Sequence, residues 1–437
     1  MKKYHVLLLF ICAFLVRLIG LNQSLWLDEA TVAKVVQEHS FISIVQQFSP
    51  FDFHPPLYYL CMKAWTLVAG YSELALRMPS VIFSLIAGYY IYKTALCFTN
   101  KKKALLALSL FLFNPLIVYY SQEARMYMLA VCLLSIATYY VFADKKQYRL
   151  STKIYSGVFL SASFAVFYGS IFYISAVLLL LFIQKKYSAF SVALFCVVIT
   201  STLLAPLTLS QLMHSRTALS NIEVWQDVLG TVTLKNILLI PLKFTIGRIT
   251  FQPKWLYLLF AGVWSAFVWF KALQGFTKYK SLLLLSIVPL LLGIIFSYFS
   301  PLLSYFRFLY LLIPVTLATA YGISTRKSAV IVIVGYVIFT LTYLLLPQFH
   351  REDWKSVAKD IPQHSIVYAV ASSMDALTYY RSDLKIRDLR LLSPQTAPDR
   401  FVIVPYTADM YGIQISDLFS SQKIINYRGL TVLFISH

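Results

Sequence analysis

The sequence predicts an all-α polytopic membrane protein of about eleven transmembrane helices, followed by a small C-terminal α/β domain. Of its 437 residues, 59% are hydrophobic and 13% are charged, and the mean hydropathy is +0.71. Apolar runs of spanning length recur up to residue 346, and the composition becomes polar after Pro347. Average soluble domains are about 45–50% apolar and about 25% charged, which excludes a water-soluble enzyme. With 16% aromatic residues and 14 glycines, collagen-like and disordered chains are excluded as well.

The first predicted element is a membrane helix at the N-terminus. The basic Lys2 and Lys3 and the apolar run 4–15 resemble a cleavable signal peptide, but no small-x-small cleavage site follows and the run continues to Gly20. We therefore expect this helix to be retained. Ten further apolar runs are long enough to span a bilayer. They lie at about 78–98, 104–120, 126–143, 154–168, 170–184, 188–206, 254–272, 281–299, 307–323 and 328–346.

The basic residues predict the orientation of these spans. The formal net charge of +20 comes from 38 Lys and Arg against 18 Asp and Glu. In a membrane protein such an excess marks cytoplasmic loops more often than a nucleic-acid partner. A cytoplasmic N-terminus places the short Lys-containing connections at 101–103 and 185–186 inside. We therefore predict a multi-pass protein of the cytoplasmic (inner) membrane, with the C-terminal domain on the extracytoplasmic side.

The first outer loop, residues 21–77, contains two predicted interfacial helices. Residues 57–70 are apolar but number only about 14 and include Lys63, which is short of the roughly 20 residues that a span needs. We expect them to lie in the outer interface, as does the amphipathic stretch 30–48. This loop belongs to a membrane domain formed by residues 1–346.

Residues 347–437 are predicted to form the C-terminal α/β domain, of about 90 residues. No Gly-rich phosphate loop or nucleophile elbow occurs in it, so we interpret it as accessory. The expected elements are helices near 352–360, 374–381 and 409–419, and strands at 366–370, 401–405 and 430–435.

The five cysteines show no CxxC pair and no His at ligand spacing, so neither a disulfide framework nor a zinc site is indicated. The sequence assigns no cofactor, and it leaves a divalent cation as an open alternative.

Ionisable residues at a bilayer are costly and indicate a functional site when they gather on one face. In the predicted topology several of them gather at the outer face. They are Asp28, Glu29, His54, Glu73, Arg77, Glu123, Arg125 and Arg307.

The acidic pair Asp28 and Glu29 is the candidate for proton transfer. Acidic residues at a helix start also cap the helix, which is a purely structural alternative. A carboxylate at a partly dehydrated interface can accept a proton from an incoming hydroxyl or amine, and its neighbour can orient the acceptor. His54, followed by two prolines that favour a helix start, can donate a hydrogen bond to a phosphate.

The arginines are candidates for binding an anion. Any one of Arg77, Arg125 and Arg307 can simply extend toward lipid headgroups. Three guanidinium groups at one depth fit a lipid-linked phosphate or pyrophosphate better, because they bind it with bidentate hydrogen bonds and stabilise the charge of a departing phosphate. Tyr127 and neighbouring aromatic residues fit either a sugar or polyprenyl groove or an ordinary interfacial belt.

Several motifs together resemble a known family. They are Arg-x-x-Gly at the end of the first helix, SLWLDEA, HPPLYYL, SELALRMPS, YYSQEARMYML, FRFLYLLIP and REDWKSVAKDI. This set is similar to the bacterial membrane glycosyltransferases of the GT-C fold (glycosyltransferase family 39-like), which are related to protein O-mannosyltransferases and lipid A aminoarabinose transferases.

The resemblance implies transfer of one sugar from a polyprenyl-phosphate donor to a lipid, glycan or protein acceptor outside the cytoplasmic membrane, with inversion. It implies that Asp28 is the catalytic base and that Glu29 contacts the acceptor or supports the base. It assigns donor or sugar binding to His54, Arg77, Glu123, Arg125, Tyr127 and Arg307. The residues 57–59 depart from the mannosyltransferase pattern, which places a protein acceptor in doubt.

Two alternatives share these features. A transporter or flippase for lipid-linked saccharides also needs outer arginines, although transporters favour related halves and charges at the midplane of the membrane. A polymerase or ligase that moves whole glycans from a pyrophosphate carrier differs only in its donor.

Overall fold

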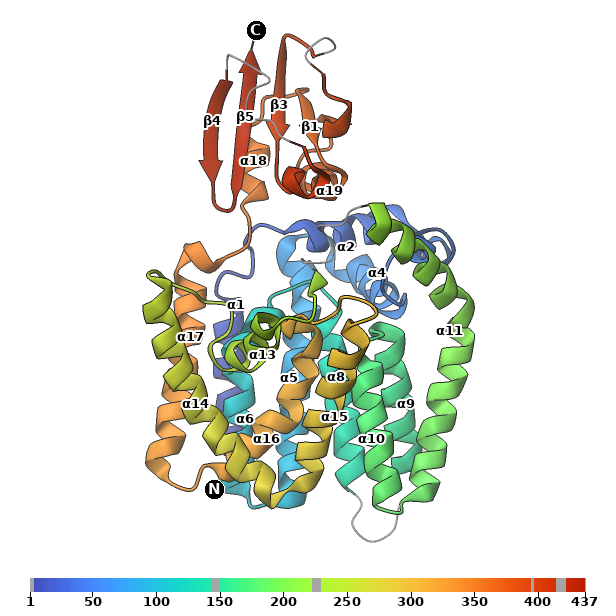
Figure 1. The fold of residues 1–437 in the computed structure, drawn as a ribbon, viewed down its shortest axis with the longest axis vertical. Helices are drawn as coiled ribbons and strands as arrows, with labels where there is room; N and C mark the ends of the chain where they lie inside the picture. The colour runs from blue at the N-terminus through green and yellow to red at the C-terminus, as the bar shows by residue number, and fades with distance from the viewer. Residues whose placement is uncertain (1–3, 144–148, 222–228, 394–396, 414–421, 437) are drawn as a thin grey trace.

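The computed structural model describes residues 4–143, 149–221, 229–393, 397–413 and 422–436. Figure 1 shows a bundle of roughly parallel helices with a small sheet domain stacked on one end, and the N-terminus at the opposite end of the bundle. The helices α2 and α4 lie across the end that carries the sheet domain.

Each predicted span coincides with a helix or with two consecutive helices. These are α1 (Tyr4–Leu18), α5 (Glu73–Phe98), α6 (Lys101–Leu112) with α7 (Pro115–Ser121), α8 (Tyr127–Ala143), α9 (Leu150–Val166), α10 (Ser170–Ile183), α11 (Tyr187–Asn221), α14 (Lys254–Lys278), α15 (Lys280–Ser297), η3 (Tyr305–Leu311) with α16 (Leu312–Gly322), and α17 (Arg326–Leu345). By length and composition, five helices of the described residues can cross a membrane, or six if α6 and α7 count as one bent span. The number eleven therefore stays a prediction.

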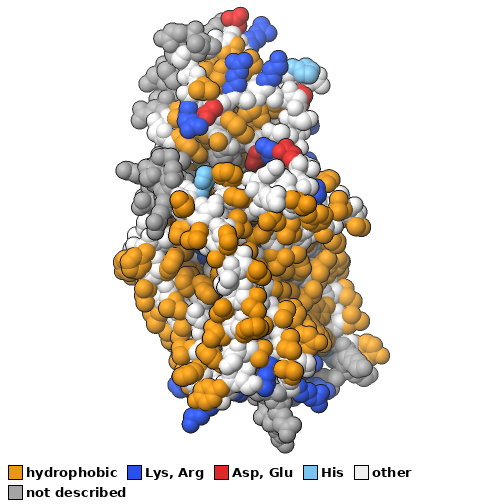
Figure 2. All heavy atoms as spheres, turned by 90° about the vertical axis from the view of Figure 1, so that its right-hand side faces the viewer, with side chains coloured by type: hydrophobic (Ala, Val, Ile, Leu, Met, Phe, Trp, Pro, Cys, Tyr) orange, Lys and Arg blue, Asp and Glu red, His pale blue; other side chains and the backbone are white. Residues whose placement is uncertain are grey.

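The surface of the bundle agrees with a membrane environment. Figure 2 shows hydrophobic side chains over most of its side, Lys and Arg at its lower end, and mixed charges on the sheet domain. Outward-facing residues include Phe195, Leu203 and Phe260, each more than 60% exposed. A face of this size has an apolar solvent as its natural partner.

The bend between α6 and α7 positions part of the site. The helix axes differ by 56° at this break. Pro115 opens α7, and the Asn114 side chain accepts hydrogen bonds from the N–H groups of Leu116 and Ile117, so the new helix start is capped. Asn114 Nδ2 also donates to the carbonyl of Phe244 in α13 (Leu234–Ile246), at 2.8 Å. The short α7 then ends at Ser121, directly before the segment that holds Glu123 and Arg125.

The first outer loop contains the expected helices, with one difference. The helix α4 (Leu57–Ala69) follows Pro55 and Pro56 and has 13 residues. The stretch 30–48, expected as one amphipathic segment, is divided into α2 (Leu27–Glu38), α3 (Phe41–Ser43) and η1 (Ile44–Phe48), and η2 (Ser49–Phe51) follows. The division falls at Ser40, whose side chain accepts from the Ser43 N–H and starts a new helical turn.

The C-terminal domain is a five-stranded sheet with order β2-β1-β3-β5-β4. Its elements are η4 (Pro347–Phe349), α18 (Trp354–Asp360), β1 (Ile366–Ala369), α19 (Ala371–Tyr380), β2 (Lys385–Asp388), η5 (Leu389–Leu391), β3 (Arg400–Val404), η6 (Ala408–Tyr411), β4 (Gln422–Tyr427) and β5 (Leu430–Ser436). β1 pairs in parallel with β2 and β3, and β5 pairs antiparallel with β3 and β4.

Three strands were expected and the two edge strands, β2 and β4, were not. β2 has the sequence KIRD and no fully buried residue, so it lacks the apolar pattern of a strand. Of the helix expected near 409–419, the described part is the short turn η6, and residues 414–419 lie outside the described residues.

This domain is docked on the first outer loop. Ala30 of α2 is buried in the same apolar cluster as Trp354 and Val357. Asp375 of α19 pairs with Lys34 at 2.9 Å, and the Tyr380 hydroxyl accepts a 2.8 Å hydrogen bond from the Leu25 N–H. The domain therefore shares a core with the helix that begins with the predicted catalytic pair.

Candidate functional site

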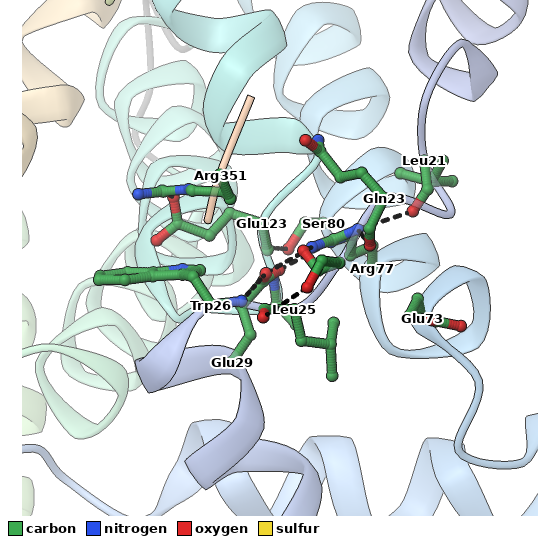
Figure 3. Close-up of polar contacts among 12 residues, drawn as sticks. Leu21, Gln23, Leu25, Trp26, Glu29, Glu73, Arg77, Ser80, Glu123 and Arg351 are labelled. Atoms are coloured by element: carbon green, nitrogen blue, oxygen red, sulfur yellow. Dashed lines mark hydrogen bonds and ion pairs between the residues drawn. The ribbon is translucent and has the colours of Figure 1, made fainter. Parts of the chain in front are cut away.

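The predicted site residues converge at the end of the bundle beneath the C-terminal domain. They come from the start of α2, the turn between η2 and α4, the N-terminal end of α5, the turn between α7 and α8, and η3. Arg351, from the linker before α18, joins them, and Figure 3 shows it with Trp26 and Glu123. Segments separated by more than 300 residues thus meet in one place.

Glu29 and Arg77 form a saturated pair. Arg77 is fully buried and donates to both carboxylate oxygens of Glu29, at 2.8 and 2.5 Å. Its remaining N–H groups donate to the carbonyls of residues 21, 23 and 24. Glu29 also accepts from the Ala124 N–H at 2.8 Å. Burial alone raises the pKa of Glu29, but Arg77 and these hydrogen bonds outweigh it and hold the pKa below its usual value.

This geometry gives Arg77 a role different from the expected donor binding. A guanidinium has five N–H donors, and all five of Arg77 have protein acceptors. No N–H group is left for a phosphate, and the side chain is inaccessible. Arg77 instead ties the chain between α1 and α2 to α5. Glu29, which was expected to contact the acceptor or support the base, is the carboxylate of this same connection between α2 and α5.

Asp28 and Arg125 form an open pair beside the saturated one. The Asp28 side chain is 44% exposed, and its Oδ2 lies 3.3 Å from Arg125 Nη2. The Arg125 side chain is only 7% exposed, and its Nε finds no hydrogen-bond partner among the described residues. A buried guanidinium that is incompletely paired is costly unless another anion binds it. Asp28 thus has room for a second partner, and Arg125 has an N–H group available.

His54 lies in the turn before α4, facing Asp52. Its Nδ1 is 3.6 Å from Asp52 Oδ2, and both atoms are buried without a hydrogen bond within the described residues. Burial alone raises the pKa of Asp52, but the charges of His54 and Arg125 hold it below its usual value. Gln211 of α11 fixes this turn, because its Nε2 donates to the carbonyls of Ser49 and His54.

Glu123 pairs with Arg351, a residue of the C-terminal segment that the sequence did not single out. The Arg351 guanidinium also lies over the rings of Trp26 and Tyr119, with its carbon 4.2 and 4.7 Å from the ring centroids. Figure 3 shows it above the Trp26 ring with the Glu123 carboxylate alongside. Burial raises the pKa of Glu123 more than the charge of Arg351 lowers it, so the pKa lies above its usual value. The motif REDWKSVAKDI was the available signal for Arg351.

Two further arginines face this region. Arg248 follows α13, is exposed, and donates from Nη1 to the Tyr119 hydroxyl at 2.6 Å. Arg307 in η3 donates from Nη1 to the carbonyls of Leu229 and Pro301. Its guanidinium also interacts electrostatically with Asp28 and Arg125. For both, Nη1 alone has an acceptor in the part of the chain that the structure describes, so other N–H groups remain for a ligand. Arg248 was missed because its segment has no distinctive pattern.

Tyr127, the first residue of α8, packs among other aromatic side chains. Its ring packs edge-on against Tyr120, Phe167 and Phe306, with centroid distances of 5.6, 5.8 and 5.4 Å. Glu73, also expected near the site, pairs instead with Lys355 of the C-terminal domain at 2.9 Å. Across the described ranges, no group of three or more His, Cys, Asp or Glu residues is arranged to hold a metal ion.

The chain matches a family model and shares a fold with solved structures. The model described as dolichyl-phosphate-mannose-protein mannosyltransferase matches residues 53–210. ArnT from Cupriavidus metallidurans in the apo state aligns with a TM-score of 0.59 and 12% identity, covering 99% of this chain and 98% of that one. The same protein bound to undecaprenyl phosphate gives a TM-score of 0.53 and 14% identity, with equal coverage.

A more distant structure has the same architecture. The oligosaccharyltransferase of Archaeoglobus fulgidus aligns with a TM-score of 0.52 and 11% identity, over 88% of this chain and 64% of that one. No curated protein matches the sequence. At such low identities these structures establish the fold, and with the family match they confirm the resemblance to GT-C membrane glycosyltransferases.

Proposed function

We propose that the protein is an integral membrane glycosyltransferase that moves a sugar from a polyprenyl-phosphate donor to an acceptor on the outer side of the cytoplasmic membrane, with Asp28 as general base. The observation that carries this proposal is the contrast among three neighbouring carboxylates. The side chains of Glu29 and Glu123 are 1% and 3% exposed, and each pairs with an arginine that is at most 10% exposed, whereas that of Asp28 is 44% exposed. A general base must reach its substrate.

Arg125, Arg248 and Arg307 form the proposed donor site. Each keeps at least one N–H group without an acceptor among the described residues, as a phosphate ligand requires. Arg248 replaces Arg77 in the expected set, because Arg77 is saturated by protein acceptors. The binding of undecaprenyl phosphate by ArnT, which shares the fold, supports a lipid phosphate as the anion. Tyr127 and Phe306 would border the sugar.

The proposed reaction is a direct displacement at the anomeric carbon. Asp28 accepts the proton of the acceptor hydroxyl or amine while the oxygen or nitrogen of that group forms a bond to the anomeric carbon of the sugar. The bond between the anomeric carbon and the phosphate oxygen breaks, and the lipid phosphate leaves with its electron pair. Because the phosphate gains negative charge, nearby guanidinium groups stabilise the transition state more than the ground state. Attack from the face opposite to the phosphate inverts the anomeric carbon.

The other predicted residues have supporting parts in this proposal. Glu29 and Arg77 hold the start of α2, and Asp28 lies next to Glu29 in the same helical turn. His54 faces Asp52, and the charge of Arg125 also acts on Asp52. His54 therefore lies near Arg125. We expect His54 to donate a hydrogen bond to the donor, as in the sequence-based prediction.

The substitution Asp28→Asn tests the proposal. It keeps the size of the side chain and removes the base, so we expect sugar transfer from a polyprenyl-phosphate donor to fall by about 10²–10⁴-fold. Purified protein in lipid nanodiscs, a radiolabelled donor and envelope extract as acceptor provide the assay. The matched control is Asp388→Asn at the end of β2, another partly exposed acid paired with a basic residue, which should keep full activity.

The alternatives give different outcomes in the same system. Full transfer by the Asp28→Asn variant removes Asp28 from the mechanism. A wild-type protein that moves the lipid-linked saccharide across the bilayer of proteoliposomes without cleaving it is a flippase. For the topology, external thiol reagents should label a cysteine introduced at exposed Lys423 but not one at exposed Lys102.

A further inference from the structure

The C-terminal domain holds the backbone of Arg351 by the turn between β4 and β5. In that turn the Arg428 carbonyl accepts from the Asp353 N–H at 3.0 Å, and Arg428 Nε donates to the Arg351 carbonyl at 2.7 Å. Gly429, at a φ of +72°, completes the turn, and a Cβ there would meet Glu352 at 3.1 Å. The linker is therefore fixed to the sheet on both sides of Glu352.

The side chain of Arg351 points away from its own domain into the membrane domain. It is 10% exposed, pairs with Glu123, and lies over the rings of Trp26 and Tyr119. A planar guanidinium over an aromatic face is attracted by the ring quadrupole, and the attraction is stronger when the pair is removed from water. Arg351 thus links a turn of the sheet domain to two segments of the bundle.

Trp26 is the residue from which α2 starts. Its carbonyl accepts the Ala30 N–H at 2.9 Å, the first hydrogen bond of the helix, and its N–H faces Glu29 Oε2 at 3.4 Å. Its Nε1 is buried and has no hydrogen-bond partner within the described residues. The indole is therefore held by packing and by the guanidinium of Arg351. Asp28 lies two residues later, so a shift of Trp26 moves Asp28.

We propose that Arg351 is a positioning residue that couples the docked C-terminal domain to Asp28 through Trp26. The C-terminal domain is then a working part of the transferase, in contrast to the accessory role expected from the sequence. This inference rests on the proposed function, because Asp28 must be the base for its position to matter. Arg351 itself touches neither the donor nor the acceptor in this proposal.

The substitution Arg351→Lys tests the position of the side chain separately from its charge. Lysine keeps a cation opposite Glu123 but loses the flat group over the two rings. We expect kcat to fall about tenfold to a hundredfold, as misplacement of a catalytic group does, with an unchanged KM for the donor. Hydrogen exchange should become at least about tenfold faster at residues 26–30 and stay unchanged within β1 and β3.

Arg428→Ala tests the coupling to the C-terminal domain. It removes the hydrogen bond to the Arg351 carbonyl, and it keeps the backbone hydrogen bond of Asp353 and the Arg351 side chain. We therefore expect the same changes at a smaller size, about twofold to tenfold in kcat. The matched control is Lys355→Gln. This substitution also removes a cation from the face of the domain that meets the bundle, but Lys355 pairs with Glu73 at the surface. It should behave like the wild-type protein.

Each remaining outcome counts against the proposal. A higher donor KM in Arg351→Lys means that Arg351 contacts the substrate, and exchange that rises throughout the protein means that it only supports the fold. An unaltered Arg428→Ala variant overturns the coupling to the domain. If the wild-type protein shows no transfer, the proposed function fails. The exchange at residues 26–30 still decides whether Arg351 positions α2, because that measurement needs no substrate.

Discussion

Two neighbouring residues of α2 form ion pairs of opposite character. Glu29 and Arg77 are buried, bidentate and fully hydrogen-bonded, whereas Asp28 and Arg125 touch at 3.3 Å with one partner 44% exposed and the other short of a hydrogen bond among the described residues. A saturated pair can only hold structure, and an incomplete pair can accept a ligand. The difference shows that charge and position alone do not identify a site residue. A site residue is identified by the hydrogen-bond donors and acceptors that it leaves free.

The largest effect is expected when the saturated pair is broken. Arg77→Ala leaves Glu29 buried without its partner and three carbonyls without a donor, so we expect a loss of about 3–5 kcal/mol in the free energy of unfolding. Thermal unfolding of the purified protein measures it. Replacing both residues, by Glu29→Leu with Arg77→Met, should recover part of the loss. A stable Arg77→Ala variant with weak donor binding would restore Arg77 to the donor site.

Breaking the open pair should affect the rate more than the stability. Arg125→Gln removes a guanidinium from the proposed departing phosphate, and we expect kcat to fall about 10²–10³-fold, as when one transition-state donor is lost. Asp28 is half exposed and can be hydrated, so the free energy of unfolding should change by less than about 1 kcal/mol. A variant that unfolds as readily as Arg77→Ala but retains its rate would reverse the comparison.

Arg248 should give a smaller effect confined to the donor. It is exposed and has one hydrogen bond to Tyr119 among the described residues, so its loss costs little stability. We expect Arg248→Gln to weaken binding of a polyprenyl phosphate about tenfold to a hundredfold, the value of a charge-assisted hydrogen bond. Titration of the lipid phosphate into nanodisc-embedded protein measures this affinity. Lys254→Gln, on an exposed residue outside the cluster, is the control.

The smallest effect is expected from pH, because Glu29 and Glu123 both keep a guanidinium partner as the pH changes. The pKa of Glu29 lies below its ordinary value of 4.5, so its contribution to stability is present above pH 4.5 and lost as the pH falls through the lowered pKa. The pKa of Glu123 lies above 4.5, so its contribution is present below pH 4.5 and lost as the pH rises through the raised pKa.

These two directions can be separated by unfolding the protein at a series of pH values. Glu29→Gln should flatten the stability profile below pH 4.5, and Glu123→Gln should flatten it above that value. A single variant that removes the pH dependence on both sides would show that the two carboxyls titrate as one coupled group.

The local pattern predicted some parts of the molecule and not others. Each long apolar run is a helix, because its own composition favours burial in an apolar solvent. The edge strands β2 and β4 were missed because neighbouring strands, more than their own sequence, hold them in place. Asp28, Arg125 and Arg307 were found as polar residues at the outer ends of spans. Arg248 and Arg351 lie in segments whose position depends on distant packing.

The sequence by itself determined the membrane-protein class, the gathering of ionisable residues at one end of the helices and the family resemblance. Composition and short motifs are properties of the chain alone, and they do not depend on how the chain folds. The tertiary structure decided which ionisable residues are free to act. It saturated Arg77, left Asp28 exposed and brought Arg351 from the C-terminal domain onto Trp26. Hydrogen-bond saturation and burial arise from residues hundreds of positions apart, so they exist only once the chain has folded.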